Sequence, residues 1–396
     1  MRGVLRPRLL LLLPTSTYRT EAFVEAARSV GAELTVASEL PSTFEREQPE
    51  NLLTLDFKNH ERAVAQAEEF HRKIPITAVL GVDDDTTVLA AVISQRLGLK
   101  HISVEAARAA RDKRIQRGVL RKSGVKIPDF EVHHIRDSVD ATQVGYPAVI
   151  KPVNLSASRG VIRINDAAEF ESARNTVAEI IRDAVTDSEG PEGRYLIEQF
   201  IAGPEFAIEG VVVAGRLHVL ALFDKPDPLD GPYFEETIYV TPSRYDEEVQ
   251  SALVGCATEA VRALGITTGP VHAELRFREE PWVIEVAARS IGGRCSRVLE
   301  FEPGRRSLEH LLIELSLGLS SDVPRRSPGA AGVMMIPIRT EGILEDVKGV
   351  AAASDVAGIT DIIITAHRGQ TLIPPPYGSQ YPGFIFARGA SATFVE

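Results

Sequence analysis

The first hundred residues alternate short apolar runs with helical segments, and this alternation restricts the fold more than any other feature of the chain. Strand-like runs occupy residues 9–13, 33–38, 76–82 and 100–104, and helical patterns occupy 21–30 and 86–98. Because apolar strands that alternate with helices form parallel sheets covered on both faces, the sequence predicts a parallel α/β domain. Ligands bind such sheets at the carboxyl ends of the strands. Asp83, Asp84 and Asp85 follow one of these strands, where they can cap the next helix or bind a substrate amine.

Length and charge narrow the class of protein. A chain of 396 residues is long for one core and indicates two or three domains. Its net charge of −11 disfavours nucleic acid as a partner, because binding to a phosphate backbone needs a basic surface. A few placed cations can still hold a small anionic ligand.

The cysteines and the first residues indicate an intracellular protein. Cys256 and Cys295 are the only cysteines, so the sequence offers no disulfide framework and no cysteine-rich metal site. Three arginines precede the apolar run 9–13, which gives a superficial likeness to a signal peptide. Pro14 ends the run after five residues and no small-residue cleavage site follows, so we expect a buried strand and a cytoplasmic protein. No apolar stretch is long enough to predict a membrane span.

The stretch VIKPVNLSASRGVIRI, residues 149–164, places a loop of small residues between two β-branched runs. Lys151 enters the loop, and Ser156, Ser158, Arg159 and Gly160 lie in it or near its exit. Small side chains let another molecule approach the backbone N–H groups. With a lysine on the preceding strand, the natural guest is a polyphosphate. The alternative is an ordinary surface hairpin.

Two predicted strands after residue 270 carry glutamates that face each other. HAELRF and WVIEV flank a plausible four-residue turn, 278–281. If Phe277 faces Trp282 across that turn, Glu274 faces Glu285. Opposed carboxylates repel each other, and a divalent cation such as Mg²⁺ between them removes that cost. In the alternative register, one residue off, the glutamates are solvated on separate faces.

Two basic side chains lie on the same predicted face as these glutamates. Arg289 follows Glu285 on that face, where an arginine can stabilise charge that develops on a transferred group. His272 faces Ala287 in the same register, and either contact with substrate or a structural role suits it.

Residues 195–213 are interpreted as strand, break and strand. The first strand ends in Glu198, Gln199, Phe200 and Ile201, interpreted as an exposed edge whose backbone can hydrogen-bond a planar heterocycle. Glu205, just past the break, can accept hydrogen bonds from ribose hydroxyls. A solvated surface glutamate is the alternative.

Together these stretches resemble the ATP-grasp superfamily, and the resemblance spans most of the chain. Its elements occur in the expected order, beginning with Asp112-Lys113 and ending with the segment that contains Arg289. The pattern IEVAARSIGGR is similar to the branch that contains L-amino-acid ligases and other amide-forming enzymes. HAELRF, the segment 223–243 and the closing YPGFIFARG are similar to the same branch.

The resemblance implies a set of site residues. Those expected to bind ATP are Lys113, Lys151, Ser156, Ser158, Arg159, Gly160, Glu198, Phe200, Ile201 and Glu205. Glu274 and Glu285 are expected to bind Mg²⁺, for which Mn²⁺ can substitute, and the candidate catalytic residues are Arg289 and His272. Lys225 is expected near the phosphates or the substrate. The chain departs from the pattern in its serine-rich loop and at Ala287, where many members have an asparagine that binds metal.

The implied activity is that of an ATP-dependent carboxylate–amine ligase. ATP would phosphorylate a carboxylate, and an amine would displace phosphate from the acyl phosphate to give an amide or dipeptide. A carboxylase of the biotin-carboxylase type, or a bicarbonate- or formate-activating enzyme of the purine-pathway type, is the first alternative, which Ala287 disfavours. A non-catalytic ATP-binding protein is the second, which the intact set of lysines, glutamates and arginine disfavours. The sequence does not identify the acid or the amine.

The resemblance also implies the organisation of the chain. We expect a combined α/β and α+β architecture, the ATP-grasp fold. An N-terminal parallel α/β domain spans 1–105 and the ATP-grasp core spans 106–325, with an ATP-binding subdomain at about 130–205 and a metal-site sheet at about 206–300. A small α+β portion spans 326–396. The expected partners are a carboxylic acid and an amine, with amino acids favoured, and a second copy of the chain in a homodimer.

Overall fold

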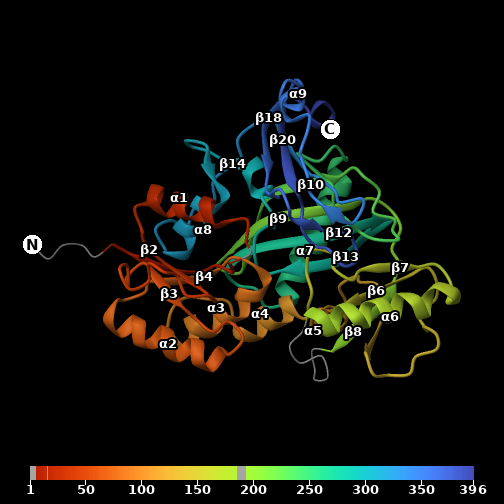
Figure 1. The fold of residues 1–396 in the computed structure, drawn as a ribbon, viewed down its shortest axis with the longest axis horizontal. Helices are drawn as coiled ribbons and strands as arrows, with labels where there is room; N and C mark the ends of the chain where they lie inside the picture. Colours follow the sequence, from red (N-terminus) through yellow and green to blue (C-terminus); the bar gives the residue numbers. More distant parts are fainter. Residues whose placement is uncertain (1–5, 16, 185–192) are drawn as a thin grey trace, which may run out of the picture.

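A computed structural model describes residues 6–15, 17–184 and 193–396. Residues 1–5, which begin the signal-like segment, lie outside this description. The chain forms three main sheets, arranged around a shared centre (Figure 1).

The N-terminal sheet is parallel, as the sequence predicts. Its order is β3-β2-β1-β4, from β1 (Arg8–Leu12), β2 (Glu33–Ser38), β3 (Leu52–Thr54) and β4 (Ala78–Gly81). Its helices are α1 (Thr20–Val30), α2 (His60–Lys73) and α3 (Asp84–Leu97). Leu9 and Leu11 pack with α1, whereas Leu10 and Leu12 pack with α2 and α3, so the two faces of β1 are covered by different helices.

The prediction of a strand at 100–104 needs correction. Residues 100–104 do not form a strand, because Ser103 caps a helix: its hydroxyl accepts from Ala106 N at 3.0 Å and α4 (Val104–Arg111) begins there. The helical segment that follows is divided at Asp112. The Asp112 carboxylate accepts from the first N–H groups of α5 (Lys113–Lys122), which fixes Lys113 at the start of that helix.

The second sheet is small and antiparallel. Its order is β5-β8-β6-β7, from β5 (Phe130–His134), β6 (Ala148–Pro152), β7 (Ile162–Ile164) and β8 (Arg194–Gln199). Helix α6 (Ala167–Ala184) packs on one face through Phe170, Val177 and Ile181. The loop 154–160 connects β6 to β7, the hairpin expected from its sequence.

The third sheet has eight strands in the order β13-β12-β9-β10-β11-β16-β20-β18. They are β9 (Glu205–Val213), β10 (Arg216–Lys225), β11 (Ile238–Thr241), β12 (Gly269–Arg278), β13 (Glu280–Ala287), β16 (Ala330–Met335), β18 (Ile359–Ile364) and β20 (Gly383–Gly389). Strands from both sides of residue 325 therefore share one sheet, and the blue C-terminal strands stand at its end (Figure 1). The domain boundaries proposed from the sequence stay predictions.

Alternate residues of β9 separate the two cores of this sheet. Ala207 and Val211 pack toward α1 and α8 (Leu308–Ser316), while Phe206 and Ile208 pack toward α5 and α7 (Glu247–Ala263). The remaining short elements are η1 (Cys295–Val298), β14 (Glu300–Phe301), β15 (Arg306–Ser307), β17 (Gly342–Ile343), α9 (Val350–Ser354), β19 (Thr371–Leu372) and α10 (Ala392–Val395). Among the described residues, no helix has the length and apolar character needed to cross a membrane.

Candidate active site

A cavity of about 420 Å³ lies where the three sheets meet. Its wall contains residues from β6 and β8, from β12 and β13, and from the segment that follows β4. Most of the site residues predicted from the sequence line this cavity: Lys113, Lys151, Ser156, Ser158, Glu198, Phe200, Ile201, Glu205, His272, Glu274, Glu285 and Arg289. Arg159 and Gly160 do not line it, and neither does Lys225, which lies behind Glu274 and pairs with it.

Glu274 and Glu285 are cross-strand partners on β12 and β13, in the predicted register, and His272 faces Ala287 as predicted. The pairs nearer the turn are not as predicted. Phe277 pairs with Pro281, because the turn is tighter and centres on Glu279, which has φ of +61°. A β-bulge beside Glu274 then shifts the register by one residue and restores the Glu274–Glu285 pair.

Each of these two carboxylates has a lysine partner. Glu285 Oε1 lies 2.9 Å from Lys113 Nζ, and Glu274 Oε1 lies 3.1 Å from Lys225 Nζ. The repulsion expected between the opposed glutamates is therefore offset by ammonium groups, and their pairing does not by itself require a metal ion.

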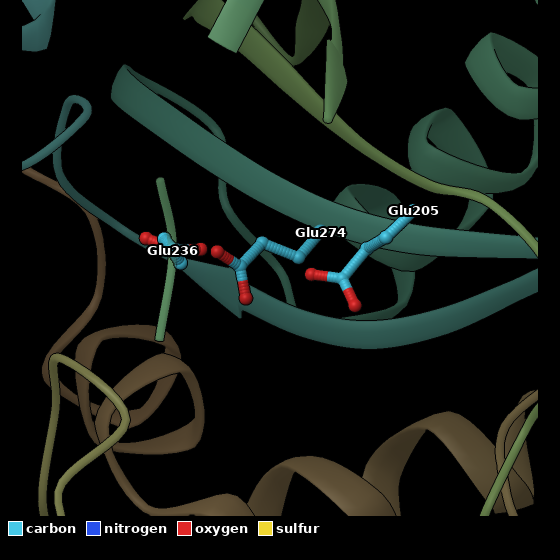
Figure 2. Close-up of side chains that lie close together, drawn as sticks. All are labelled: Glu205, Glu236 and Glu274. Carbon is cyan, nitrogen blue, oxygen red and sulfur yellow. The ribbon is translucent and has the colours of Figure 1, made fainter. Parts of the chain in front are cut away.

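Glu274 belongs to a cluster of three glutamates that share one ammonium group. Lys225 Nζ also lies 2.7 Å from Glu205 and 2.5 Å from Glu236, and is itself buried. One carboxylate oxygen from each of Glu205, Glu236 and Glu274 lies within 4.8 Å of the others, a spacing that can hold a metal ion. Figure 2 shows the three side chains converging, with the Glu236 and Glu274 carboxylates facing each other. The structure thus groups Glu274 with these two glutamates more closely than with Glu285.

His272 lies between Glu274 of this cluster and the buried Glu209. Its Nδ1 lies 3.1 Å from Glu209 Oε2 and its Nε2 lies 3.7 Å from Glu274 Oε1. Burial opposes protonation of His272, but the hydrogen bonds to Glu209 and Glu274 raise its pKa to about 9. Burial likewise opposes ionisation of Glu274, yet Lys225 and His272 lower the pKa of that carboxyl well below its usual range. His272 is positioned to orient Glu274.

A second buried cluster lies near the loop 154–160. Glu198 forms ion pairs with Lys151 and, at 3.0 Å, with Arg117 of α5. Burial lowers the pKa of Lys151, and the Glu198 carboxylate offsets part of that effect. Lys113 Nζ donates to Leu155 O at 2.8 Å, so this lysine connects the loop to Glu285.

The expected free edge at Glu198 and Gln199 is not present. Strand β8 lies between β5 and β6, and Gln199 N donates to Asp129 O at 2.9 Å. The chain leaves the sheet after Phe200, whose ring lies 6.3 Å from that of Phe234, centroid to centroid. Arg276 donates to Ile201 O at 2.8 Å and to Glu205 at 2.8 Å, so Glu205 is held by Arg276 and Lys225.

In the loop 154–160, Ser156 and Ser158 line the cavity, whereas the last two residues, Arg159 and Gly160, do not. Ala157 and Ser158 have φ of +52° and +55°, a left-handed turn that small residues adopt with little side-chain hindrance. The Arg159 guanidinium pairs with Asp183 at 2.7 Å, and Gly160 N donates to Pro376 O at 2.9 Å. These contacts hold Arg159 and Gly160 against other segments and not at the cavity wall.

Arg289 lies at the opposite end of the cavity, beside the N-terminal sheet. Its Nε donates to Asp84 Oδ2 at 2.9 Å. Asp83 occupies the N-cap position of α3 and Asp85 pairs with Arg111 at 2.6 Å, so capping and charge pairing account for all three aspartates that follow β4. Arg19, which is buried and donates to Ser290 Oγ at 2.8 Å, lines the same end.

Sequence reasoning missed several residues of the site. Glu236 and Phe234 lie in the segment 223–243, whose resemblance to the ligase branch did not single out either residue. Gln116 and Arg117 lie three and four residues after Lys113, so all three side chains share the buried face of α5. This spacing is the signal that could have found them, but a buried helix face is normally recognised by apolar residues, and these are polar. Glu209, on the buried strand β9, is a further polar residue in an apolar run.

Known protein families match most of the chain. Residues 144–298 match the ATP-grasp domain, residues 24–101 match the ATP-grasp N-terminal domain, and residues 334–396 match the L-amino acid ligase C-terminal domain 2. The crystal structure of L-amino acid ligase from Bacillus licheniformis is 27% identical, with a TM-score of 0.85, and the match covers 98% of this chain and 95% of that one. The chain belongs to the ATP-grasp superfamily.

Relatives of this ATP-grasp protein include one named a ligase and one named a synthase. It is 29% identical over 301 residues to alanine–anticapsin ligase of Bacillus subtilis (strain 168), a match that covers 68% of this chain and 63% of the relative. It is 26% identical over 330 residues to carnosine synthase 1 of Homo sapiens, covering 78% of this chain and 39% of the relative. The chain thus spans less than two thirds of the length of these relatives. The expected resemblance, to ATP-grasp proteins and to L-amino-acid ligases among them, is confirmed, as is the fold.

Proposed function

We propose that this protein is an ATP-dependent carboxylate–amine ligase that forms an amide or dipeptide bond through an acyl phosphate. One observation carries the proposal: a single cavity is lined by Lys113, Lys151 and Arg289 together with convergent carboxylates, and the buried Lys225 pairs with one of these, Glu274. The names of the relatives agree with this class of reaction.

The nucleotide is proposed to lie between the small sheet and the large sheet. Phe200, Phe234 and Ile201 offer apolar surface for adenine, next to Glu205 for the ribose. Lys113 and Lys151 would neutralise phosphates, and the N–H groups at Ser156 and Ser158 would hydrogen-bond them.

The carboxylates suit Mg²⁺ chemically, because this ion prefers oxygen ligands. Glu274 and Glu285 would hold it, with Glu236 near enough to contribute. When bound, Mg²⁺ supplies charge neutralisation to the phosphate oxygens. The Glu209–His272–Glu274 chain would keep the Glu274 carboxylate in place.

The reaction we infer has two steps. An oxygen of the acid's carboxylate attacks the γ-phosphorus of ATP, and the bond to the β-phosphate oxygen breaks to release ADP. The amine nitrogen then attacks the acyl carbon, phosphate leaves, and the nitrogen loses a proton to give the amide. Arg289, held by Asp84 at the far end of the cavity, would stabilise the acyl phosphate and the oxyanion of the second step.

Hydroxylamine trapping tests this proposal. The protein, ATP, Mg²⁺ and a panel of carboxylic acids, with amino acids first, are incubated with hydroxylamine, and hydroxamate and ADP are measured. We expect equimolar hydroxamate and ADP from at least one acid. ADP formed only with bicarbonate, and without hydroxamate, would contradict the ligase and support a carboxylase. The homodimer and the amino-acid nature of both substrates stay proposals that the same preparations can test.

A further inference from the structure

A C-terminal segment, between β19 and β20, contacts the loop 154–160. We call residues 374–381 the clasp. Gly160 N donates to Pro376 O at 2.9 Å, and Arg159 Nε donates to Tyr377 O at 3.1 Å. Both donors belong to the loop 154–160, more than two hundred residues earlier in the sequence.

Tyr377 anchors the clasp to the helix behind this loop. Its hydroxyl donates to Glu179 Oε2 of α6 at 3.0 Å. Arg159 is at the same time paired with Asp183, one turn later on α6. The loop, α6 and the clasp are therefore held together by side chains at one place.

The clasp is built as a stiff turn. Residues 374–376 are consecutive prolines, whose φ angles are fixed by their rings. Gly378 N donates to Pro374 O at 2.9 Å, and a Cβ at Gly378 would lie 1.7 Å from Ile373 O, so the turn needs glycine there. The prolines and the Gly378 hydrogen bond restrict the backbone at the start of the clasp.

The far end of the clasp borders the cavity. Ser379, Gln380 and Tyr381 line it, as do Ser156 and Ser158 of the loop. Tyr381 is fixed there by Phe384, with ring centroids 6.1 Å apart, and by its carbonyl, which accepts from Thr365 Oγ1 at 2.8 Å. One short segment therefore contacts the loop at one end and forms cavity wall at the other.

We propose that the clasp couples the position of the loop 154–160 to the part of the cavity lined by Ser379–Tyr381, and that Tyr377 is a positioning residue for the reaction. Binding of ATP phosphates by the loop would, through Pro376 and Tyr377, restrict residues 379–381 in the part of the cavity wall that they already form. ATP and the acid would then strengthen each other's binding. This inference rests on the proposed function for its ligands, and on the hydrogen bonds between the loop, α6 and the clasp for its route.

Hydrogen–deuterium exchange tests the coupling without turnover. The full-length protein is compared with and without the Mg²⁺ complex of the β,γ-imido analogue of ATP. In the wild type we expect slower exchange in both 154–160 and 374–381. In Tyr377→Phe we expect the analogue to slow exchange in the loop but to leave the clasp within error of the free protein. Tyr245→Phe, which removes the hydroxyl of a partly exposed tyrosine outside the cavity, is the control and should behave as the wild type.

The outcomes separate this inference from the proposed function. Protection of the loop without protection of the clasp in the wild type would overturn the coupling while ATP binding stands. No protection in either segment would overturn both. Identical behaviour of Tyr377→Phe and the wild type would show that the Tyr377 hydroxyl is not the connection.

Steady-state kinetics gives a second readout once an acid is known. Loss of this one exposed hydrogen bond predicts rises of about two- to fivefold in KM for both ATP and the acid, with kcat changed less than about twofold. Glu179→Gln should give the same split, and the double variant should be no worse than either single one. Equal losses of kcat in all three variants, with KM unchanged, would contradict a positioning role.

Discussion

Glu274 and Glu285 lie directly opposite each other on β12 and β13, and a β-bulge beside them is what sets this register. The turn between the strands is tighter than its sequence suggests, and without the bulge Glu285 would point to the opposite face of the sheet. Lys113 and Lys225 approach this pair from outside the hairpin, one from α5 and one from β10. The hairpin thus supplies the carboxylates, and two other elements supply their countercharges.

Replacing either glutamate should remove activity and spare the fold. Glu274→Gln or Glu285→Gln keeps the side-chain volume but loses a charge that would bind Mg²⁺. Since such an ion contributes several kcal/mol to transition-state stabilisation, kcat/KM should fall by about 100-fold or more. Glu279→Gln, at the exposed apex of the same hairpin, is the control and should retain activity. Full activity of Glu285→Gln at limiting Mg²⁺ would exclude its role as a ligand.

Asp84 is expected to act through Arg289. Asp84→Asn keeps the shape of the side chain but weakens its hold on the guanidinium, so kcat should fall about tenfold. Arg289→Lys, which loses the planar donor set, should lower kcat further, by about 100-fold. The double variant should resemble Arg289→Lys alone, because Asp84 has no separate role. Additive losses in a double-mutant cycle of kcat would contradict that dependence.

Gln116 is expected to stabilise the strand that carries Glu285. Its amide donates to Val286 O at 2.7 Å and accepts from Val286 N at 3.0 Å, on the edge strand β13. Gln116→Leu would leave both buried backbone groups unpaired, and the free energy of unfolding should fall by about 2–4 kcal/mol. Gln95→Leu, at an exposed position of α3, should change it by less than about 0.5 kcal/mol. Denaturant unfolding measures both, and equal values for the two variants would contradict the assignment.

Gly203 should be intolerant of a side chain, whereas Gly215 should accept one at moderate cost. Both have positive φ, so Gly→Ala costs about 1 kcal/mol at either position from backbone conformation. At Gly203 a Cβ would also lie 2.2 Å from Phe277 O, while at Gly215 nothing lies within 4 Å. We expect Gly203→Ala to lower the free energy of unfolding by about a further 1–3 kcal/mol, measured by thermal or denaturant unfolding. A smaller loss for Gly203→Ala than for Gly215→Ala would show that the break after β8 relaxes freely.

Local sequence patterns predicted the parallel sheet, the small-residue hairpin and the opposed glutamates, because each depends on residues close together in the chain. Local patterns did not predict features that depend on contacts between residues far apart in the chain. The end of β8 looked like a free edge, but β5 pairs with it, and no local signal places that strand. The buried face of α5 is polar because its partners are the β13 backbone and Glu198, so a search for apolar stripes overlooks Gln116 and Arg117. Glu236 reaches Lys225 only through the path of a long loop.

The most direct test of the central claim is an isotope transfer. The acid identified by hydroxamate trapping is labelled with ¹⁸O in its carboxylate, incubated with the protein, ATP, Mg²⁺ and the amine, and the phosphate and nucleotide products are analysed by mass spectrometry. An acyl phosphate requires one carboxylate oxygen to leave with phosphorus, so the account predicts one ¹⁸O in each inorganic phosphate and none in ADP. Label in AMP, or amide formed with unlabelled phosphate, would contradict it.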